Sequence, residues 1–272
     1  MKRNESDVAF YIMNSKGWFV FNRFIHKYGV SKVAYVVSER DANMQDDPYG
    51  QIRQLALDFK IPFYERSEFD EQIEANFKGY KFAIGWRKLI KSRHNLVVFH
   101  DSLLPKYRGF APLVNSLINK EARIGVTAFF ASEKYDEGAI IAQKSVDAVY
   151  PLKIDAAITK IQPLYLDLVC EIYEDIVRNV PILVSEQDHS HATYSLWLDQ
   201  DDYFIDWQWS AEKIKRFVDA VGFPYDGAKA RMNGKVVTVL DVQVVDDVCV
   251  EHRERHVGKV IFRDMEPTIV CT

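Results

Sequence analysis

A histidine and an aspartate each follow an apolar segment of the sequence and could act together in proton transfer. His100 ends the apolar run at 96–99, and Asp136 follows the apolar segment at 126–130, two residues before Gly138. A carboxylate beside an imidazole orients the ring and stabilises its protonated form, and such a pair serves as general acid and base. His100 and Asp136 are therefore the candidate catalytic residues. For His100 considered alone, a buried histidine with a structural hydrogen bond is an equally good interpretation.

The elements expected to position this pair alternate between strands and helices. Such alternation predicts βαβ units and an α/β fold with a mostly parallel, Rossmann-like sheet. Ligands of open α/β sheets bind outside the carboxyl ends of the strands, so His100 should lie in a binding site, with Asp136 at the same sheet edge. Pro163 should kink or split the last helix. Strands are expected at 8–13, 33–38, 61–64, 82–86, 96–99, 126–130 and 139–146, and helices at 18–28, 48–60, 69–77, 112–119 and 154–179.

Polar residues after the His100 strand are candidates for binding a substrate. A proline and a glycine exclude a regular element there, which leaves Lys106, Tyr107 and Arg108 on a loop that could face an anionic ligand. Exposure to solvent, or a role in holding the loop, is equally consistent with the two cations.

A second polar loop, N-S-K-G at 14–17, follows the first expected strand. Backbone N–H groups at the start of a helix favour anions, which makes Ser15 and Lys16 further candidates for substrate binding. The segment lacks both the G-x-G-x-x-G and the Walker spacing. An ordinary strand-to-helix turn is therefore the favoured interpretation from the residues alone.

Composition sets outer limits on the function. The chain has 272 residues, 48% of them hydrophobic, enough for one substantial core and a smaller one. Its net charge of -4 gives no general attraction for nucleic acid. Its 3 cysteines show no disulfide or metal-ligand spacing, so we expect no metal and a reducing cytoplasm. Because no long apolar span or signal-like segment is present, we expect a soluble protein that is not exported and has no membrane partner.

Three motifs, in this order and spacing, resemble those of the formyltransferase-fold family. They are H-D-S-L-L-P-K-Y-R-G-F-A-P at 100–112, I-G-V-T-A at 124–128 and D-E-G-A-I-I-A-Q at 136–143. Members of that family use 10-formyltetrahydrofolate, and they include methionyl-tRNA, glycinamide ribonucleotide and nucleotide-sugar N-formyltransferases. The resemblance is greatest to the nucleotide-sugar group and covers most of the chain to about Val245.

The resemblance implies a chemical role for the candidate residues. A neutral substrate amine would attack the formyl carbon, His100 would accept the amine proton or donate to the developing oxyanion, and Asp136 would hold and stabilise His100. The loop at 85–90 resembles the family loop whose backbone borders the pterin ring of the folate, whereas its side chains are expected to cap the core or meet solvent. The cofactor-binding candidates that the resemblance implies are Gly85, Trp86, Arg87, Leu89, Ile90 and Phe130.

One position departs from the family pattern. Family members carry N-x-H, with the asparagine side chain donating to the formyl oxygen, and the matching position here is Val98. Valine cannot donate, and the loss of one oxyanion donor costs on the order of a hundredfold to a thousandfold in rate. We expect Asn115, at the start of the next helix, a backbone N–H group or His100 itself to take this role.

The chain is expected to divide into a catalytic domain at 1–184, a linker at 185–210 and a small C-terminal domain at 211–272. The last contains a helix and β-strands and resembles a truncated OB-like barrel. Its shortness and its small positive charge favour a sugar over tRNA, and it is expected to supply a β-hairpin for a homodimer. Trp197 and Tyr225 offer stacking faces for a nucleotide base, with packing between the domains as the alternative.

Together, these observations predict a bacterial enzyme that formylates the amino group of a dTDP- or UDP-linked amino-deoxysugar. The product would serve surface polysaccharide synthesis, such as that of the lipopolysaccharide O-antigen. Three alternatives remain: a methionyl-tRNA formyltransferase, a formyltetrahydrofolate hydrolase, and a non-catalytic protein that binds folate or a nucleotide sugar. The last is motivated by Val98.

Overall fold

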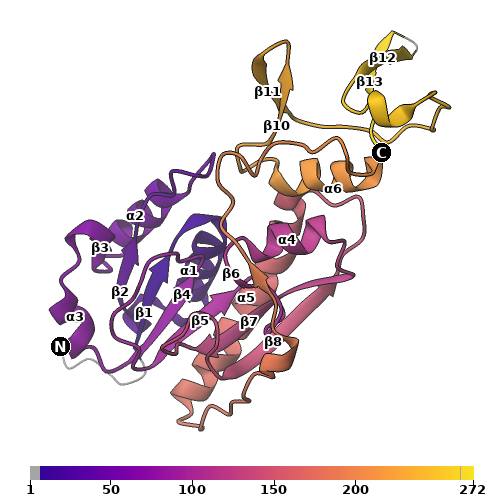
Figure 1. Ribbon diagram of the computed structural model, residues 1–272. Helices are drawn as coiled ribbons and strands as arrows, with labels where there is room; N and C mark the ends of the chain where they lie inside the picture. The colour runs from indigo at the N-terminus through magenta and orange to yellow at the C-terminus, as the bar shows by residue number, and fades with distance from the viewer. Residues whose placement is uncertain (1–6, 264) are drawn as a thin grey trace.

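A seven-stranded sheet forms the centre of the protein (Figure 1). The structure is a computed structural model and describes residues 7–263 and 265–272. The strand order is β3-β2-β1-β4-β5-β7-β8, and β7 alone runs in the opposite direction to the other six strands. The mostly parallel α/β sheet predicted from the sequence is therefore confirmed. The strands are β1 (Val8–Ile12), β2 (Val33–Ser38), β3 (Phe63–Glu65), β4 (Tyr80–Ile84), β5 (Leu96–His100), β7 (Arg123–Phe130) and β8 (Ile140–Asp147).

The two faces of the sheet pack against different clusters. Successive side chains of a strand point to opposite faces, and in β5 Val97 and Phe99 join the larger cluster, which includes residues of α1, α4 and α5. Leu96 and Val98 instead face a smaller, aromatic cluster around Tyr11. The helices are α1 (Asn14–Tyr28), α2 (Tyr49–Asp58), α3 (Glu71–Asn76), α4 (Pro112–Ile118) and α5 (Ile154–Val177), with short 3-10 helices η1 (Val30–Lys32) and η2 (Arg66–Glu68).

Two helices differ from the sequence-based expectation. Helix α1 starts at Asn14 rather than at Trp18, so the N-S-K-G segment forms its first turn. The Asn14 side chain accepts a hydrogen bond from the Lys16 backbone N–H at 3.1 Å, which satisfies one of the free donors of that turn. Helix α5 is not split but continues through Pro163, because its apolar stripe is buried on both sides of the proline.

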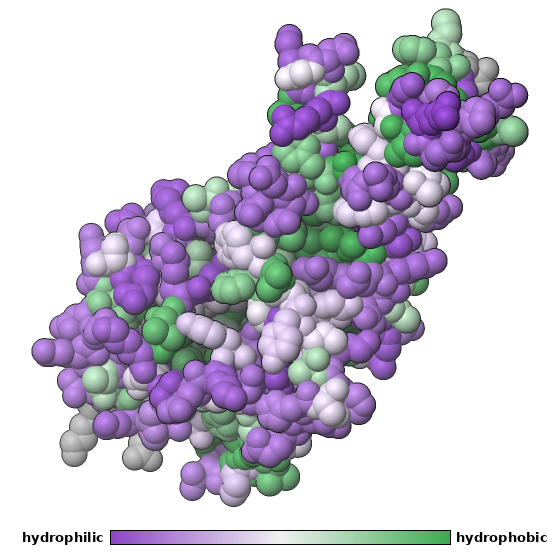
Figure 2. Space-filling view, in the orientation of Figure 1, coloured by the Kyte–Doolittle hydropathy of each residue, from purple (hydrophilic) through white to green (hydrophobic). Residues whose placement is uncertain are grey.

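The C-terminal part is rich in β-strands, as expected. Its hairpins β10–β11 and β12–β13 are separate two-stranded sheets that extend beyond α6, away from the central sheet (Figure 1). Apolar residues lie among hydrophilic ones on their surfaces (Figure 2). Within residues 7–263 and 265–272, no helix has the length and apolar character needed to cross a membrane. The remaining elements are β6 (Arg108–Gly109), η3 (His189–His191), β9 (Tyr194–Ser195), α6 (Ala211–Val221), β10 (Ala228–Met232), β11 (Lys235–Val239), η4 (Arg253–Arg255), β12 (Val260–Arg263) and β13 (Glu266–Ile269).

Candidate functional site

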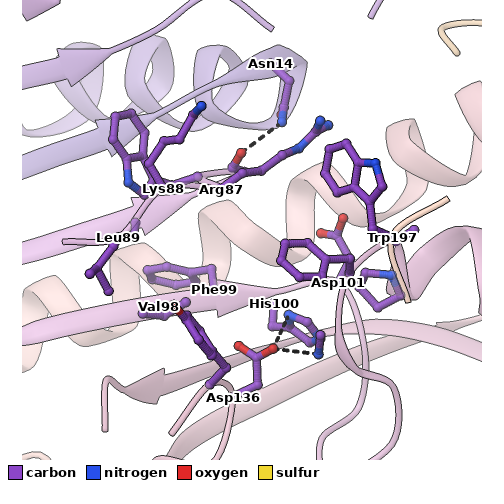
Figure 3. Close-up of a pocket in the computed structure, with 18 of the residues that line it drawn as sticks. Asn14, Arg87, Lys88, Leu89, Val98, Phe99, His100, Asp101, Asp136 and Trp197 are labelled. Atoms are coloured by element: carbon purple, nitrogen blue, oxygen red, sulfur yellow. Dashed lines mark hydrogen bonds and ion pairs between the residues drawn. The ribbon is translucent and has the colours of Figure 1, made fainter. Parts of the chain in front are cut away.

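A pocket of about 910 Å³ lies at the carboxyl ends of β1, β4 and β5 (Figure 3). Its walls come from the loops after these strands, from the loop between β7 and β8, and from residues between 197 and 226. This is the edge at which open α/β sheets bind their ligands. The sequence-predicted residues that line it are Lys16, Gly85, Trp86, Arg87, Leu89, Ile90, His100, Asp136, Trp197 and Tyr225.

The His100 ring is held in one orientation at the end of β5. Its Nε2 atom lies 2.7 Å from the carbonyl oxygen of Tyr107, and because a carbonyl oxygen only accepts, Nε2 must donate. Neutral His100 therefore keeps its proton on Nε2 and its lone pair on Nδ1. That nitrogen lies 3.8 Å from Asp136 Oδ2, as the dashed lines in Figure 3 show. His100 can thus take up a proton beside a carboxylate that stabilises the resulting charge.

Asp136 reaches His100 by a route that the sequence did not predict. Because β7 runs antiparallel to β5, its last residue, Phe130, pairs with Val97, toward the start of β5 and away from His100. The loop after β7 then folds back, and its residues 131–136 all line the pocket. The sequence-based expectation was that β7 would end at the same sheet edge as His100. The strand ends at the opposite edge instead, and the loop that follows it brings Asp136 back to His100.

Three hydrogen bonds hold the returning loop in place. The Gly109 backbone N–H donates to Asp136 Oδ2 at 2.7 Å. The Gln187 side-chain amide donates to the carbonyl oxygens of Asp136 and Gly138, both at 2.8 Å. A Cβ atom at Gly138 would lie 1.7 Å from the Phe130 carbonyl oxygen, so the backbone approaches too closely there for any other residue.

Arg108 supports this loop and does not line the pocket. Its side chain is 1% exposed, and its Nε and Nη2 atoms donate to Gln187 Oε1 at 3.2 and 2.7 Å. Nη2 also lies 3.1 Å from His189 Nδ1, and Nη1 lies 3.5 Å from a Glu137 oxygen. Sequence reasoning missed Gln187, which belongs to a polar stretch without periodicity, so nothing in the sequence distinguished it.

Several other sequence-predicted residues also lie outside the pocket lining. The Lys106 ammonium and the Tyr107 hydroxyl both contact Glu121, at 3.2 and 2.8 Å. The Asn115 amide donates to the carbonyl oxygen of Ala111, one turn earlier in its own helix, at 2.9 Å. Asn115 therefore does not supply the donor that Val98 lacks in this structure. The residues in this group are Ser15, Lys106, Tyr107, Asn115 and Phe130.

An apolar slot lies on one side of His100. The loop at 85–90 forms one wall and Val98 contributes to its floor. The Gly85 carbonyl oxygen accepts a hydrogen bond from the Asn14 side chain at 3.3 Å, which ties this loop to the start of α1. Trp86 Nε1 is buried and has no hydrogen-bond partner among the described residues. The slot thus offers apolar surface together with backbone groups.

A buried polar cluster lies on the other side of His100. Asp101 pairs with the Lys16 ammonium and accepts a hydrogen bond from the Tyr165 hydroxyl. Burial by itself would raise the pKa of Asp101, but Lys16 and Tyr165 outweigh it and hold that pKa below its usual value. All three residues line the pocket. Sequence reasoning missed Asp101, although it adjoins His100, and assigned Tyr165 to the apolar stripe of its helix.

Aromatic residues from the C-terminal part close this side of the pocket. Trp197 is 47% exposed and packs edge-to-face on Phe110, with ring centroids 5.6 Å apart. The Arg87 guanidinium lies 5.7 Å from the Trp197 ring centroid and pairs with Asp41 at 2.8 Å. Burial, followed by the nearby Asp101 carboxylate, raises the pKa of Tyr225 to about 12, so its hydroxyl stays protonated and can donate.

Comparison with known proteins identifies the family. Residues 2–162 match the model described as formyl transferase, and residues 198–272 match the model for the formyl transferase C-terminal domain. The first match alone covers more than half of the chain. This protein therefore belongs to the formyl transferase family.

Curated relatives with similar sequences are methionyl-tRNA formyltransferases. That of Thermotoga neapolitana is 34% identical over 170 residues, which cover 61% of this chain and 53% of the relative. That of Fervidobacterium nodosum is 28% identical over 190 residues, which cover 67% of this chain and 60% of the relative. The matched stretch thus spans between half and two thirds of these relatives.

Solved structures with the same fold include sugar formyltransferases. A 4-N formyltransferase from Francisella tularensis aligns with a TM-score of 0.67 and 19% identity, over 89% of this chain and 100% of its own. An N-formyltransferase from Helicobacter canadensis, in complex with folinic acid and dTDP-3-aminofucose, has a TM-score of 0.65 and 14% identity, over 84% of both chains. HypX from Aquifex aeolicus has a TM-score of 0.65 and 15% identity, over 97% of this chain and 43% of HypX. At these identities the likeness establishes the fold.

Proposed function

We propose that this protein transfers the formyl group of 10-formyltetrahydrofolate to the amino group of a nucleotide-linked amino-deoxysugar. The observation that carries the proposal is the position of His100 Nδ1. It lies 3.8 Å from Asp136 Oδ2 between an apolar slot and a polar cluster of one pocket. A formyl donor and an amine acceptor could therefore meet at one basic nitrogen.

The slot suits the folate donor. A pterin is flat and carries hydrogen-bonding groups on its edge, and the slot supplies the apolar surface of Val98 and Leu89 together with the backbone of the loop at 85–90. The donor supplies the formyl group; the protein supplies its orientation and the proton transfers.

The proposed reaction needs one group that both takes and gives a proton. A bond forms between the acceptor nitrogen and the formyl carbon, while the bond from that carbon to the folate nitrogen breaks. His100 Nδ1 accepts the proton lost by the amine and returns it to the departing nitrogen, with Asp136 stabilising the interim charge. The Tyr107 carbonyl keeps the other nitrogen protonated throughout, so the ring need not turn.

Several observations support a nucleotide sugar as acceptor. Two solved structures with this fold hold such ligands: WlaRD, a sugar 3N-formyl transferase, was determined with dTDP and 5-N-formyl-THF, and the Helicobacter canadensis N-formyltransferase with folinic acid and dTDP-3-aminofucose. The exposed Trp197 ring offers a stacking face for a base. A net charge of -4 gives a tRNA no general attraction. We further propose that the exposed C-terminal hairpins join two copies of the chain and that the product serves surface polysaccharide synthesis.

A methionyl-tRNA formyltransferase is the second candidate. Its support is the 34% identity to the Thermotoga neapolitana enzyme. Against it stands the net charge of -4.

The test offers the purified protein 10-formyltetrahydrofolate with a panel of dTDP- and UDP-linked 3-amino and 4-amino sugars, and in parallel with methionyl-tRNA. Mass spectrometry follows formylation of each acceptor. We expect one sugar to be formylated and His100→Ala to lower kcat by about a hundredfold to ten-thousandfold. Formylation of methionyl-tRNA alone would replace the sugar by the second candidate. Release of tetrahydrofolate without any formylated acceptor would refute the transferase.

A further inference from the structure

The polar cluster of Lys16, Asp101 and Tyr165 is not needed to explain proton transfer by His100. The alternation of β5 sends Val98 and His100 to the face of the apolar slot, whereas the chain after His100 turns Asp101 toward α1 and α5, where Lys16 and Tyr165 lie. Asp136 and Asp101 thus lie on different sides of the His100 ring, as Figure 3 shows. The pocket extends over the sheet edge and includes both sides.

The Asp101 carboxylate has unused hydrogen-bonding capacity. Among the described residues each of its oxygens has one hydrogen-bond partner, Lys16 Nζ for Oδ2 and the Tyr165 hydroxyl for Oδ1. An ionised carboxylate accepts about four hydrogen bonds, and the 13% exposure of the Asp101 side chain is toward the pocket that it lines. Lys16 keeps this buried group charged, because an unpaired carboxylate in such a place would take up a proton.

Stability alone does not account for the cluster. A buried ion pair contributes little to folding compared with apolar residues of similar size, because desolvation of both charges offsets their attraction. Here the pair is placed in the wall of the pocket, directly after His100, where apolar residues would serve the core better. Its position therefore favours a role toward a bound molecule.

We propose that Asp101 binds the amino group of the acceptor and holds it next to the His100 ring. This inference rests on the proposed function and assigns the acceptor end of the site to a primary amine. An N–H of the amine donates to Asp101. The Lys16 ammonium offsets the charge of Asp101, so the pair as a whole does little to hold the amine as an ammonium, and the neutral amine is the form that can attack a formyl carbon. Asp101 makes and breaks no covalent bond and is a binding residue.

The test separates the acceptor end of the site from the donor end. Asp101→Asn keeps the shape but removes the charge, and Asp167→Asn, an exposed carboxylate of α5 outside the pocket lining, makes the same change as a matched control. We expect Asp101→Asn to raise the KM for the amine acceptor that the wild type formylates by about tenfold to a hundredfold. The affinity for 10-formyltetrahydrofolate should remain within about twofold of the wild type in both variants.

A second measurement isolates the amino group itself. The affinity of the acceptor is compared with that of its analogue in which hydrogen replaces the amino group. The wild-type protein should prefer the amine, and Asp101→Asn should lose most of that preference. If Asp101→Asn does not fold with Lys16 left unpaired, the double variant Asp101→Asn, Lys16→Met removes both charges and should show the same loss.

The outcomes are distinct. An unchanged KM and an unchanged preference for the amine in a folded variant would overturn the role of Asp101 while leaving the transferase in place. If the wild-type protein formylates no acceptor, the proposed function fails, and the role of Asp101 fails with it.

Discussion

Replacing Gln187 by leucine should release the loop that carries Asp136. Gln187 is 5% exposed. Its amide nitrogen donates to the carbonyl oxygens of Asp136 and Gly138 at 2.8 Å, and its oxygen accepts from Arg108 at 3.2 and 2.7 Å. Leucine has a similar volume and leaves no large cavity. The change therefore removes four hydrogen bonds and little else.

The magnitude follows from these contacts. Two neutral hydrogen bonds contribute about 1 kcal/mol each and two bonds from a guanidinium about 1.5 to 3 kcal/mol each, but such values do not add fully. Arg108 keeps its contacts with His189 and Glu137, so we expect a loss of about 3 to 5 kcal/mol, as for a broken buried pair. Each kcal/mol shifts Tm by roughly 2 to 4 °C at this size, which predicts a fall of about 10 °C. A shift of about 1 Å in Asp136 would lower kcat by about a hundredfold.

A second variant separates stability from positioning. Gln187→Glu keeps an acceptor for Arg108 and adds a charge to that pair, but a carboxylate cannot donate to the Asp136 and Gly138 carbonyl oxygens. Thermal unfolding and steady-state formyl transfer at saturating acceptor are measured for both variants. Because it keeps its pairing with Arg108, Gln187→Glu should lose less stability than Gln187→Leu, yet it should show a reduced kcat. Wild-type kcat in both variants would refute the idea that Gln187 positions Asp136.

Three further predictions concern single positions. Val98→Asn should raise kcat of formyl transfer, by up to about a hundredfold, if the pocket lacks an oxyanion donor there; an unchanged kcat would show that another group already donates. Gly138→Ala should lower Tm and kcat because its Cβ would meet a carbonyl oxygen at 1.7 Å, whereas Gly50→Ala, with nothing within 4 Å, should leave both unchanged or raise Tm slightly. Folding lowers the pKa of Asp101, so the unfolded chain binds more protons in acid and the stability due to that carboxylate is lost as pH falls through the folded pKa. In thermal melts, the difference in stability between the wild type and Asp101→Asn should be constant above about pH 5. Below about pH 4 the wild type should lose stability relative to Asp101→Asn.

The positions of the strands along the chain were predictable because an apolar run is a local feature of the sequence. The segment expected at 33–38 is β2 (Val33–Ser38), and the run expected at 96–99 is β5, which includes one residue more. Both strands are apolar because both are buried in the sheet. A polar residue that directly ends such a run lies at the ligand-binding edge, which is why His100 could be found from the sequence.

The parts that were not predictable depend on contacts between distant segments. The direction of β7 is set by its pairing with β5 and β8, and no residue within β7 encodes it. Arg108 was expected to face a ligand because an arginine after a strand is normally exposed. Its burial depends on Gln187, 79 positions away. A buried arginine must have a hydrogen-bonding partner, but the sequence alone does not show which residue that partner is.

The reversed direction of β7 also explains how one histidine could serve two substrates. Because the loop after β7 starts away from His100 and returns along the Val98 side of β5, Asp136 approaches the ring from that side. The residue that follows His100 in the chain is then free to turn to the other side, where α1 and α5 supply Lys16 and Tyr165 for Asp101. The two carboxylates consequently have different surroundings. Asp136 is held by a backbone N–H group and its charge is available to a protonated His100, whereas the charge of Asp101 is already balanced by an ammonium and its remaining capacity is for hydrogen bonds.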